Sequence, residues 1–128
     1  MTSRIIDLST LSTAEGVIIQ GDAAGDRAGR SVSVAGDVNG DGIDDVIVGA
    51  ERGGVSDTGE AYVVYGTTGG RGTVDLGMLS ATEGFVIVGD SPGDLLGMAE
   101  GVSAAGDVNG DGIDDVIVGA AFGDDGGF

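Results

Sequence analysis

The sequence predicts an all-β protein built from four-stranded antiparallel blades of an incomplete β-propeller. Three observations lead to this fold class. Short apolar runs rich in β-branched residues alternate with turns, and 28 of the 128 residues are glycine. The stretch DVNGDGIDDVIVGA at 37–50 recurs without change at 107–120. Each unit of about 70 residues holds four short strand segments, which is typical of a propeller blade or of a turn of a β-solenoid.

Strand segments are recognised as β-branched or alternating runs bounded by glycine and acidic turns. The complete unit is predicted to contain four of them, at 31–35, 45–49, 61–65 and 84–88. Three more are predicted outside it, at 17–20, 101–105 and 115–119. The segment Glu15–Gly21 matches Glu83–Gly89, so we expect the strand at 17–20 to be the outer strand of a blade that comes from elsewhere.

These matches divide the chain into three parts. Residues 1–25 would supply the outer strand of a preceding blade, 26–89 a complete blade, and 90–128 the first half of the next blade. The unfinished blades leave strand edges without partners, and open edges recruit other chains. We therefore expect the isolated chain to form homo-oligomers through its open blade edges.

Acidic and amide side chains fall on alternate positions of the repeated stretch, between glycines that allow a tight curl. Ca²⁺ takes six to eight hard oxygen ligands in a tolerant geometry, so each copy is predicted to bind one Ca²⁺. The expected ligands are the side chains of the first, third, fifth and ninth positions and the backbone carbonyl of the seventh. In the two copies these are Asp37, Asn39, Asp41, Ile43 and Asp45, and Asp107, Asn109, Asp111, Ile113 and Asp115.

A hairpin turn without a metal, a Mg²⁺ site and an EF-hand are the alternatives to such a Ca²⁺ loop. Asn39-Gly40 and Asp41-Gly42 also form hairpin turns without a metal, and Mg²⁺ is a weaker rival because it demands strict octahedral geometry. An EF-hand is excluded because its twelfth position, a glutamate, is occupied here by Val48. Asp44 and Asp45 are neighbours at a strand entry and should face opposite ways, so only Asp45 is predicted to be a ligand.

Composition excludes several functions. With 5 arginines, no lysine and 22 acids, the formal net charge is −17, so nucleic acid and anionic membranes are not expected partners. No run is long enough to span a membrane, and the first residues lack a signal-peptide core. Because histidine and cysteine are absent, Ser–His and Cys–His nucleophiles are impossible, and the chain is not predicted to be an enzyme.

The stretch AGDVNGDGIDDVIVGA, at 35–50 and 105–120, resembles the FG-GAP repeats of the integrin α-chain β-propeller and of its bacterial relatives. The resemblance runs from about residue 25 to the end. The "FG" of the family appears as Ala28-Gly29 and Leu96-Gly97. The "GAP" appears as Gly49-Ala50-Glu51 and Gly119-Ala120-Ala121.

The resemblance implies a calcium-stabilised propeller module at the cell surface or in an extracellular setting, with a role in adhesion or in binding a protein or other extracellular ligand. Candidate partner loops, which in the family lie mostly opposite the calcium loops, are 22–29, 51–59 and 90–97. An alternative is a non-catalytic accessory propeller segment of a larger secreted hydrolase. A third interpretation is a structural repeat in which the metal is incidental.

Overall fold

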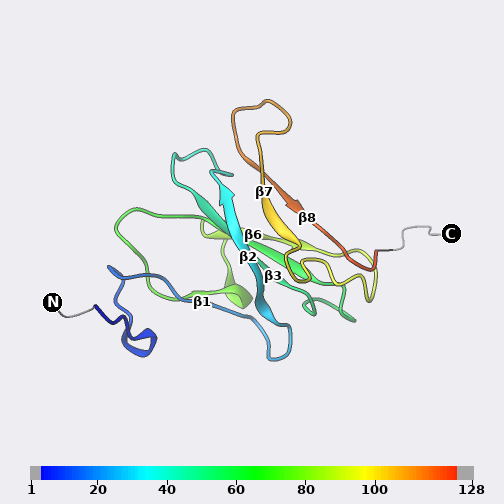
Figure 1. Ribbon diagram of the computed structural model, residues 1–128, viewed down its shortest axis with the longest axis horizontal. Coiled ribbons are helices and arrows are strands. Elements are labelled where there is room, and N and C mark those ends of the chain that lie inside the picture. Colours follow the sequence, from blue (N-terminus) through cyan, green and yellow to red (C-terminus); the bar gives the residue numbers. More distant parts are fainter. Residues whose placement is uncertain (1–3, 124–128) are drawn as a thin grey trace.

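The computed structural model describes residues 4–123, which form mainly strands and turns. Its strands are β1 (Ile19–Gln20), β2 (Ala28–Gly36), β3 (Asp45–Ala50), β4 (Glu60–Val64), β5 (Val74–Asp75), β6 (Gly84–Val88), β7 (Val102–Gly106) and β8 (Asp115–Val118). Within the described range, the helical elements are two short 3-10 turns, η1 (Leu8–Thr10) and η2 (Leu76–Met78). The all-β class is therefore confirmed, with mostly antiparallel sheets (Figure 1).

A four-stranded antiparallel sheet with the order β2-β3-β4-β6 forms the centre of the molecule. These are the four strands predicted for the complete unit, although β2 begins earlier, at Ala28, before an irregularity in its register. Side chains alternate between the two faces, since period 2 governs a strand. Ile47 lies opposite Val63 on one face, and Val48 lies opposite Tyr62 on the other. All four side chains are buried, so this sheet is covered on both sides of its middle strands.

The second sheet, β7-β8, is an antiparallel hairpin that packs against one face of the central sheet, beside β2 (Figure 1). Val102 of β7 is 5% exposed. It shares a core with Ala35, Ile47, Ala61 and Val63 of the central sheet, and β8 adds the partly buried Val116 and Val118. The identical stretches at 37–50 and 107–120 therefore form the loop and second strand of two neighbouring hairpins, which are joined through their apolar faces.

The opposite face of the central sheet is partly covered by β1, β5 and η2, whose Val74 and Leu76 pack against Val48, Tyr62 and Val64. Here the structure differs from the strand predicted at 17–20 in its bounds and in its pairing within this chain, whereas its assignment to a preceding blade stays a prediction. The strand is only Ile19–Gln20, and it pairs in parallel with β5 of the same chain. The two strands lie side by side in the fold, and the N–H of Val74 donates to the carbonyl of Ile18 at 2.8 Å.

The turns before β1 and β6 repeat the same hydrogen bonds. Asp7 caps η1 by accepting from the N–H of Ser9 at 2.9 Å, and Asp75 caps η2 in the same way. Ser12 then donates its N–H to Glu15 at 3.0 Å, as Ser80 does to Glu83. These are the contacts that a Ser-x-x-Glu pair makes at a turn. The internal repeat thus extends back to Asp7, beyond the segment Glu15–Gly21 matched by sequence.

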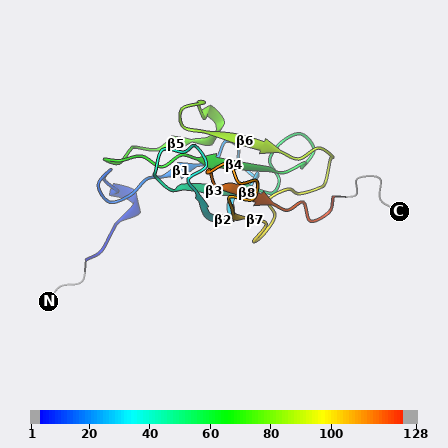
Figure 2. The same ribbon diagram turned by 90° about the horizontal axis from the view of Figure 1, so that it is seen from above.

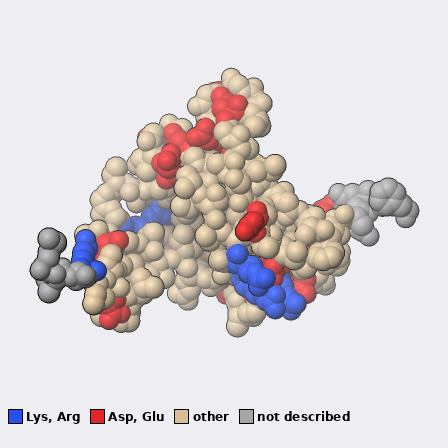
Figure 3. Space-filling view, viewed as in Figure 1, with Lys and Arg blue, Asp and Glu red and all other residues tan. Residues whose placement is uncertain are grey.

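Two groups of loops lie at opposite ends of the sheets. The β2–β3 and β7–β8 loops carry the repeated acidic motif, and Figure 3 shows acidic side chains gathered over both of them at the top. The segments 22–27, 51–59 and 90–97 lie at the opposite end, where the N–H of Gly93 bonds to the carbonyl of Ser56 at 3.1 Å. The ends of the described chain point to opposite sides (Figure 2). Between residues 4 and 123, no helix has the length and apolar character needed to cross a membrane.

Candidate metal-binding loops

Asp37 organises the first acidic loop through backbone hydrogen bonds. Its Oδ1 accepts from the N–H groups of Gly40 at 2.7 Å and Asp41 at 3.0 Å, and its Oδ2 accepts from the N–H of Gly42 at 2.7 Å. Gly40 and Gly42 have φ values of 76° and 84°, a region in which other residues are strained. The glycines therefore curl the backbone around one carboxylate, as the sequence pattern predicted.

The middle of the loop places further oxygens close together. Asn39 accepts from the N–H of Asp41 at 3.2 Å through Oδ1, and its amide donates to Asp41 Oδ2 at 3.1 Å. Asp41 in turn accepts from the N–H of Ile43 at 2.9 Å. Each of these oxygens retains an unused lone pair, since a carboxylate offers about four acceptor positions. The oxygen donors thus suit a hard cation such as Ca²⁺.

Asp45 links the acidic loop to the strands beneath it through its buried carboxylate. It is fully buried, and its two oxygens accept from the N–H groups of Val38 at 2.9 Å and Gly66 at 2.8 Å. Asp44, one residue earlier, is exposed. The expectation that these two side chains face opposite ways is confirmed. Asp45 ties the acidic loop to the end of β4, a structural task that the sequence pattern did not reveal.

The second loop repeats this network almost bond for bond. Asp107 accepts from the N–H groups of Gly110, Asp111 and Gly112 at 2.8, 3.1 and 2.8 Å. The N–H of Gly112 holds the pKa of Asp107 below its ordinary value. Burial opposes this effect, and hydrogen bonds from Gly110 and Asp111 add to it. A carboxylate that stays ionised at lower pH is ready to bind a cation, because metal ligands must be deprotonated.

The remaining predicted ligands of this loop follow the first copy closely. Asn109 accepts from the N–H of Asp111 at 3.1 Å, and Asp111 accepts from the N–H of Ile113 at 2.9 Å. Asp115 accepts from the N–H of Val108 at 2.8 Å through Oδ2. The pattern of one acidic residue folded under each loop is therefore shared. Of the two, Asp45 is the more deeply buried.

The three carboxylates of each loop do not converge on one position. Among the described residues, one group of three acids brings its oxygens within 4.8 Å of one another, and it lies outside both loops. Within each loop the carboxylates instead accept hydrogen bonds from backbone N–H groups. The acid at the ninth position bonds to the N–H of the second residue of the motif. The ligand set from Asp37 to Asp45, with its counterpart from Asp107 to Asp115, therefore stays a prediction.

The two loops also contact each other. The N–H of Asp37 donates to Asp114 Oδ2 at 3.0 Å, and the N–H of Asp114 donates to the carbonyl of Asp37 at 3.0 Å. A side chain at Gly36 would collide with Asp114, since a Cβ there would lie 2.4 Å from the Asp114 carboxylate. The residue at the eighth position of the motif thus joins neighbouring repeats.

Comparison with known proteins agrees with this geometry. The family model for the FG-GAP repeat matches residues 28–64 and 101–128, which together make up just over half of the chain. The chain belongs to the FG-GAP repeat family. It is 36% identical over 115 residues to integrin alpha pat-2 of Caenorhabditis briggsae, and 33% identical over 115 residues to integrin alpha pat-2 of Caenorhabditis elegans. Each match covers 86% of this chain but only 9% of the relative's length.

One departure from the FG-GAP pattern has a structural consequence. Glu51 stands at the position of the family's proline and is only 3% exposed. Its Oε1 forms an ion pair with Arg27 Nη1 at 2.8 Å, and Arg27 has a φ of 60°. The N–H of the next residue, Arg52, bonds to the carbonyl of Asp26 at 3.2 Å. The substitution therefore helps fasten the 51–59 segment to the loop that precedes β2.

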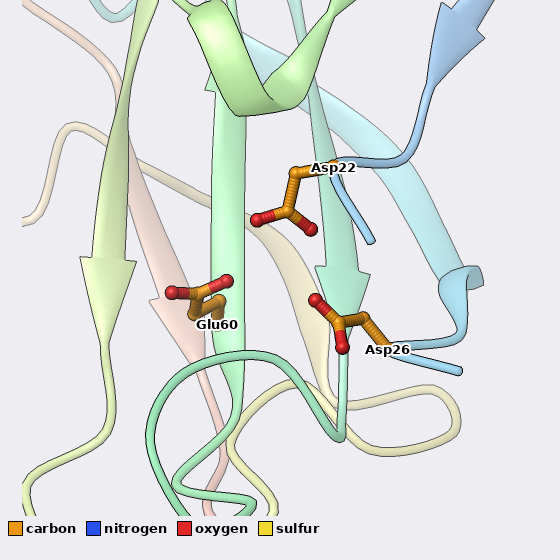
Figure 4. Close-up of side chains that lie close together, drawn as sticks. All are labelled: Asp22, Asp26 and Glu60. Atoms are coloured by element: carbon orange, nitrogen blue, oxygen red, sulfur yellow. The ribbon is translucent and has the colours of Figure 1, made fainter. Parts of the chain in front are cut away.

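The group of three acids that lies outside the FG-GAP motif consists of Asp22, Asp26 and Glu60. Figure 4 shows their carboxylates pointing toward one another from the loop before β2 and the start of β4. Tyr62 donates its hydroxyl to Glu60 Oε2 at 2.5 Å. Burial and the acceptor Glu60 raise the pKa of the Tyr62 hydroxyl. Sequence reasoning missed this cluster because Glu60 joins it from a distant strand.

Asp26 lies in an unfavourable position as an anion. Burial, followed by the carboxylate of Asp22 and the charges of Glu60 and Asp57, raises the pKa of Asp26 above its ordinary value. A raised pKa means that the folded state binds the proton more tightly than the unfolded state. Stability should therefore increase as the pH falls through the folded-state pKa, and the ionised form destabilises the fold at neutral pH.

Asp26→Asn is expected to raise the melting temperature at pH 7 by a few degrees, because it removes a partly buried charge that faces the carboxylates of Asp22 and Glu60. The gain over the parent should shrink in thermal melts near pH 4, where Asp26 of the parent becomes protonated. Asp90→Asn is the matched control, since Asp90 is exposed in the second copy of the same loop. A fall in melting temperature that occurs only with divalent cations present would instead identify the cluster as a cation site.

Proposed function

We propose that the chain is a calcium-stabilised part of an FG-GAP β-propeller that acts in adhesion or in binding a protein or extracellular ligand, outside the cell or on its surface. The observation that carries this proposal is the duplicated acidic loop, in which both copies present the same oxygen donors on the same backbone curl. Calcium at these loops would be structural. When bound, it would neutralise carboxylates that otherwise repel one another.

The chemistry of such loops supports the proposed extracellular setting. Modules of extracellular proteins bind Ca²⁺ at about 10⁻⁴–10⁻³ M, a concentration found outside cells. The family relationship supports the same setting, since the curated relatives are named integrins. The segments 22–29, 51–59 and 90–97 lie at the end away from the acidic loops, and this end is the proposed surface for a partner.

Calorimetric titration with Ca²⁺ is expected to show about two sites per chain. The double variant Asp41→Ala with Asp111→Ala should lose both, because it removes the central ligand of each loop. The control Asp90→Ala with Glu100→Ala removes the same charge from exposed positions and should keep both sites. Retention of binding in the loop variant would show that the ligands lie elsewhere, with Asp22, Asp26 and Glu60 the next candidates.

Calcium should also stabilise the fold. A ligand at ten times its Kd adds about 1.4 kcal/mol per site, so two filled sites would add about 2.8 kcal/mol. Melting in excess chelator should therefore occur at a clearly lower temperature than in saturating calcium, while the β-type circular dichroism of the folded state is retained. The loop double variant should melt at the same temperature in both solutions. A parent whose melting is indifferent to chelator would support the interpretation in which the metal is incidental.

A further inference from the structure

One interface inside the chain joins two nearly identical hairpins. Val102 of the second hairpin packs on Ala35 and Ile47 of the first, and all three are at most 5% exposed. At its upper end, Asp37 and Asp114 exchange two hydrogen bonds of 3.0 Å. The contact is head to tail, because the first hairpin uses one of its faces and the second hairpin uses the opposite face.

Each hairpin therefore carries both halves of this interface and uses only one. On the first hairpin the unused half consists of Val32, Val34 and Val46, here called the valine face. These side chains are 65%, 55% and 37% exposed. Val32 corresponds to Val102, which is 5% exposed in its place against the central sheet. The valine face is thus exposed apolar surface, whereas Val102, the residue 70 positions after Val32, is buried.

On the second hairpin the unused half consists of Ala105, Val108 and Ile117, here called the hairpin face. Ile117 is 60% exposed and Val108 is 72% exposed. The residue corresponding to Ile117 is Ile47, which is fully buried beneath β7 and β8. Val48, the counterpart of Val118, is already covered within the chain by the core that contains Val74 and Leu76. The two unused halves are therefore complementary through the remaining residues, Val32, Val34 and Val46 on one side and Ala105, Val108 and Ile117 on the other.

The polar groups at the edge of the interface are also in place. Asp44 corresponds to Asp114 and is exposed, with its side chain on the outer surface. A Cβ at Gly36 would meet the Asp114 carboxylate at 2.4 Å, whereas a Cβ at Gly106 would have nothing within 4 Å. The backbone at Gly106 and Asp107 has the same curl, with a φ of 72° at Gly106 against 76° at Gly36. The space that Asp114 fills beside the first loop is open beside the second.

We propose that the valine face of one copy of this chain binds the hairpin face of a second copy, in the arrangement that the two hairpins adopt within the chain. Asp44 of one copy would accept the backbone N–H of Asp107 in the other. The contact is heterologous, so repeated addition gives a ring or an open filament. This inference goes beyond the proposed function and does not require a bound cation.

The N-terminal segment leaves Val32 and Val34 of the valine face exposed. Ile19 of β1 packs with the core around Val48 and Tyr62, which Ala28 at the start of β2 also contacts. Residues 13–17 and Ile19 line a cavity of ≈ 420 Å³ together with Asp44 and Val46, so this segment borders the valine face at Val46. The face is therefore open over Val32 and Val34, and Val46 lies at its margin. The net charge of −17 opposes association, so the contact should strengthen as salt screens that repulsion.

The test uses two variants that each block one half. Val34→Asp blocks the valine face, and Ile117→Asp blocks the hairpin face. Both positions are more than half exposed within one chain, so the fold should tolerate the change. In sedimentation velocity, the parent should form concentration-dependent oligomers, and each variant alone should sediment as a monomer. An equimolar mixture should give a one-to-one dimer that grows no further, because one intact half of each kind remains.

Val55→Asp controls for the added charge, since Val55 is 83% exposed in a loop at the other end, and it should assemble like the parent. If either aspartate variant fails to fold by circular dichroism, Val34→Ser and Ile117→Ser take their place. A monomeric parent at its highest soluble concentration would overturn the proposal. So would a mixture that stays monomeric, or a blocked variant that still assembles alone.

A second pair of variants tests the polar contact. Asp44→Ala should raise the dissociation constant several-fold without changing the melting temperature of dilute monomer. Asp90→Ala, an exposed acid with the same charge change, should slightly favour assembly by lowering the net charge. Equal behaviour of the two variants would mean that Asp44 makes no specific contact, and would overturn the proposed alignment with Asp107.

Discussion

Ile47→Ala is expected to lower the free energy of unfolding by about 2–5 kcal/mol, while the same change at Ile117 should lower it by less than about 1 kcal/mol. The two isoleucines occupy the same place in identical stretches of sequence. Ile47 is fully buried between the central sheet and β7–β8, and Ile117 is 60% exposed. Only the first substitution therefore leaves a cavity in the core.

Urea unfolding at low protein concentration measures both effects, and dilution keeps a second copy from covering Ile117. Each variant should keep the parent's m value if the transition stays two-state. Equal losses from the two substitutions would contradict the packing described here, since they would place Ile117 in a core as dense as that around Ile47.

Asp45→Ala is expected to lower the free energy of unfolding by about 3 kcal/mol even in excess chelator. The substitution removes the acceptor of two backbone N–H groups, those of Val38 and Gly66, at a fully buried position. Buried donors left without a partner lose their hydration and gain nothing in return. The chelator matters because it separates this structural task from any loss of bound calcium.

Asp115→Ala is the matched control, because Asp115 holds the same place in the motif. It accepts from the N–H of Val108 and is less deeply buried than Asp45. Its substitution in chelator should lower the free energy of unfolding by about 1 kcal/mol. If both variants matched the parent in chelator and fell behind it only with calcium, the ninth acid would act solely as a ligand.

The sequence located the central sheet well because its signals are local. Glycines and acidic turns bracket the runs at Asp45–Ala50 and Glu60–Val64, and the β-branched residues within them suit a pleated surface. The structure differs from the prediction for residues 17–20 in the bounds of the strand and in its pairing within this chain. That segment was assigned by its match to β6, yet its partner was decided by what lies nearby, which is β5.

The sequence by itself determined the all-β class, the four strands of the central sheet and the curl of both acidic loops. Each of these depends on residues close together in the chain, such as Gly40 and Gly42 around Asp37. Only the tertiary structure decided that Ile47 is buried and Ile117 exposed, that Asp114 bonds to Asp37, and that Glu60 meets Asp22 and Asp26. Identical sequence acquires different surroundings because burial and long-range contacts depend on which neighbour each face meets, and no local pattern records that neighbour.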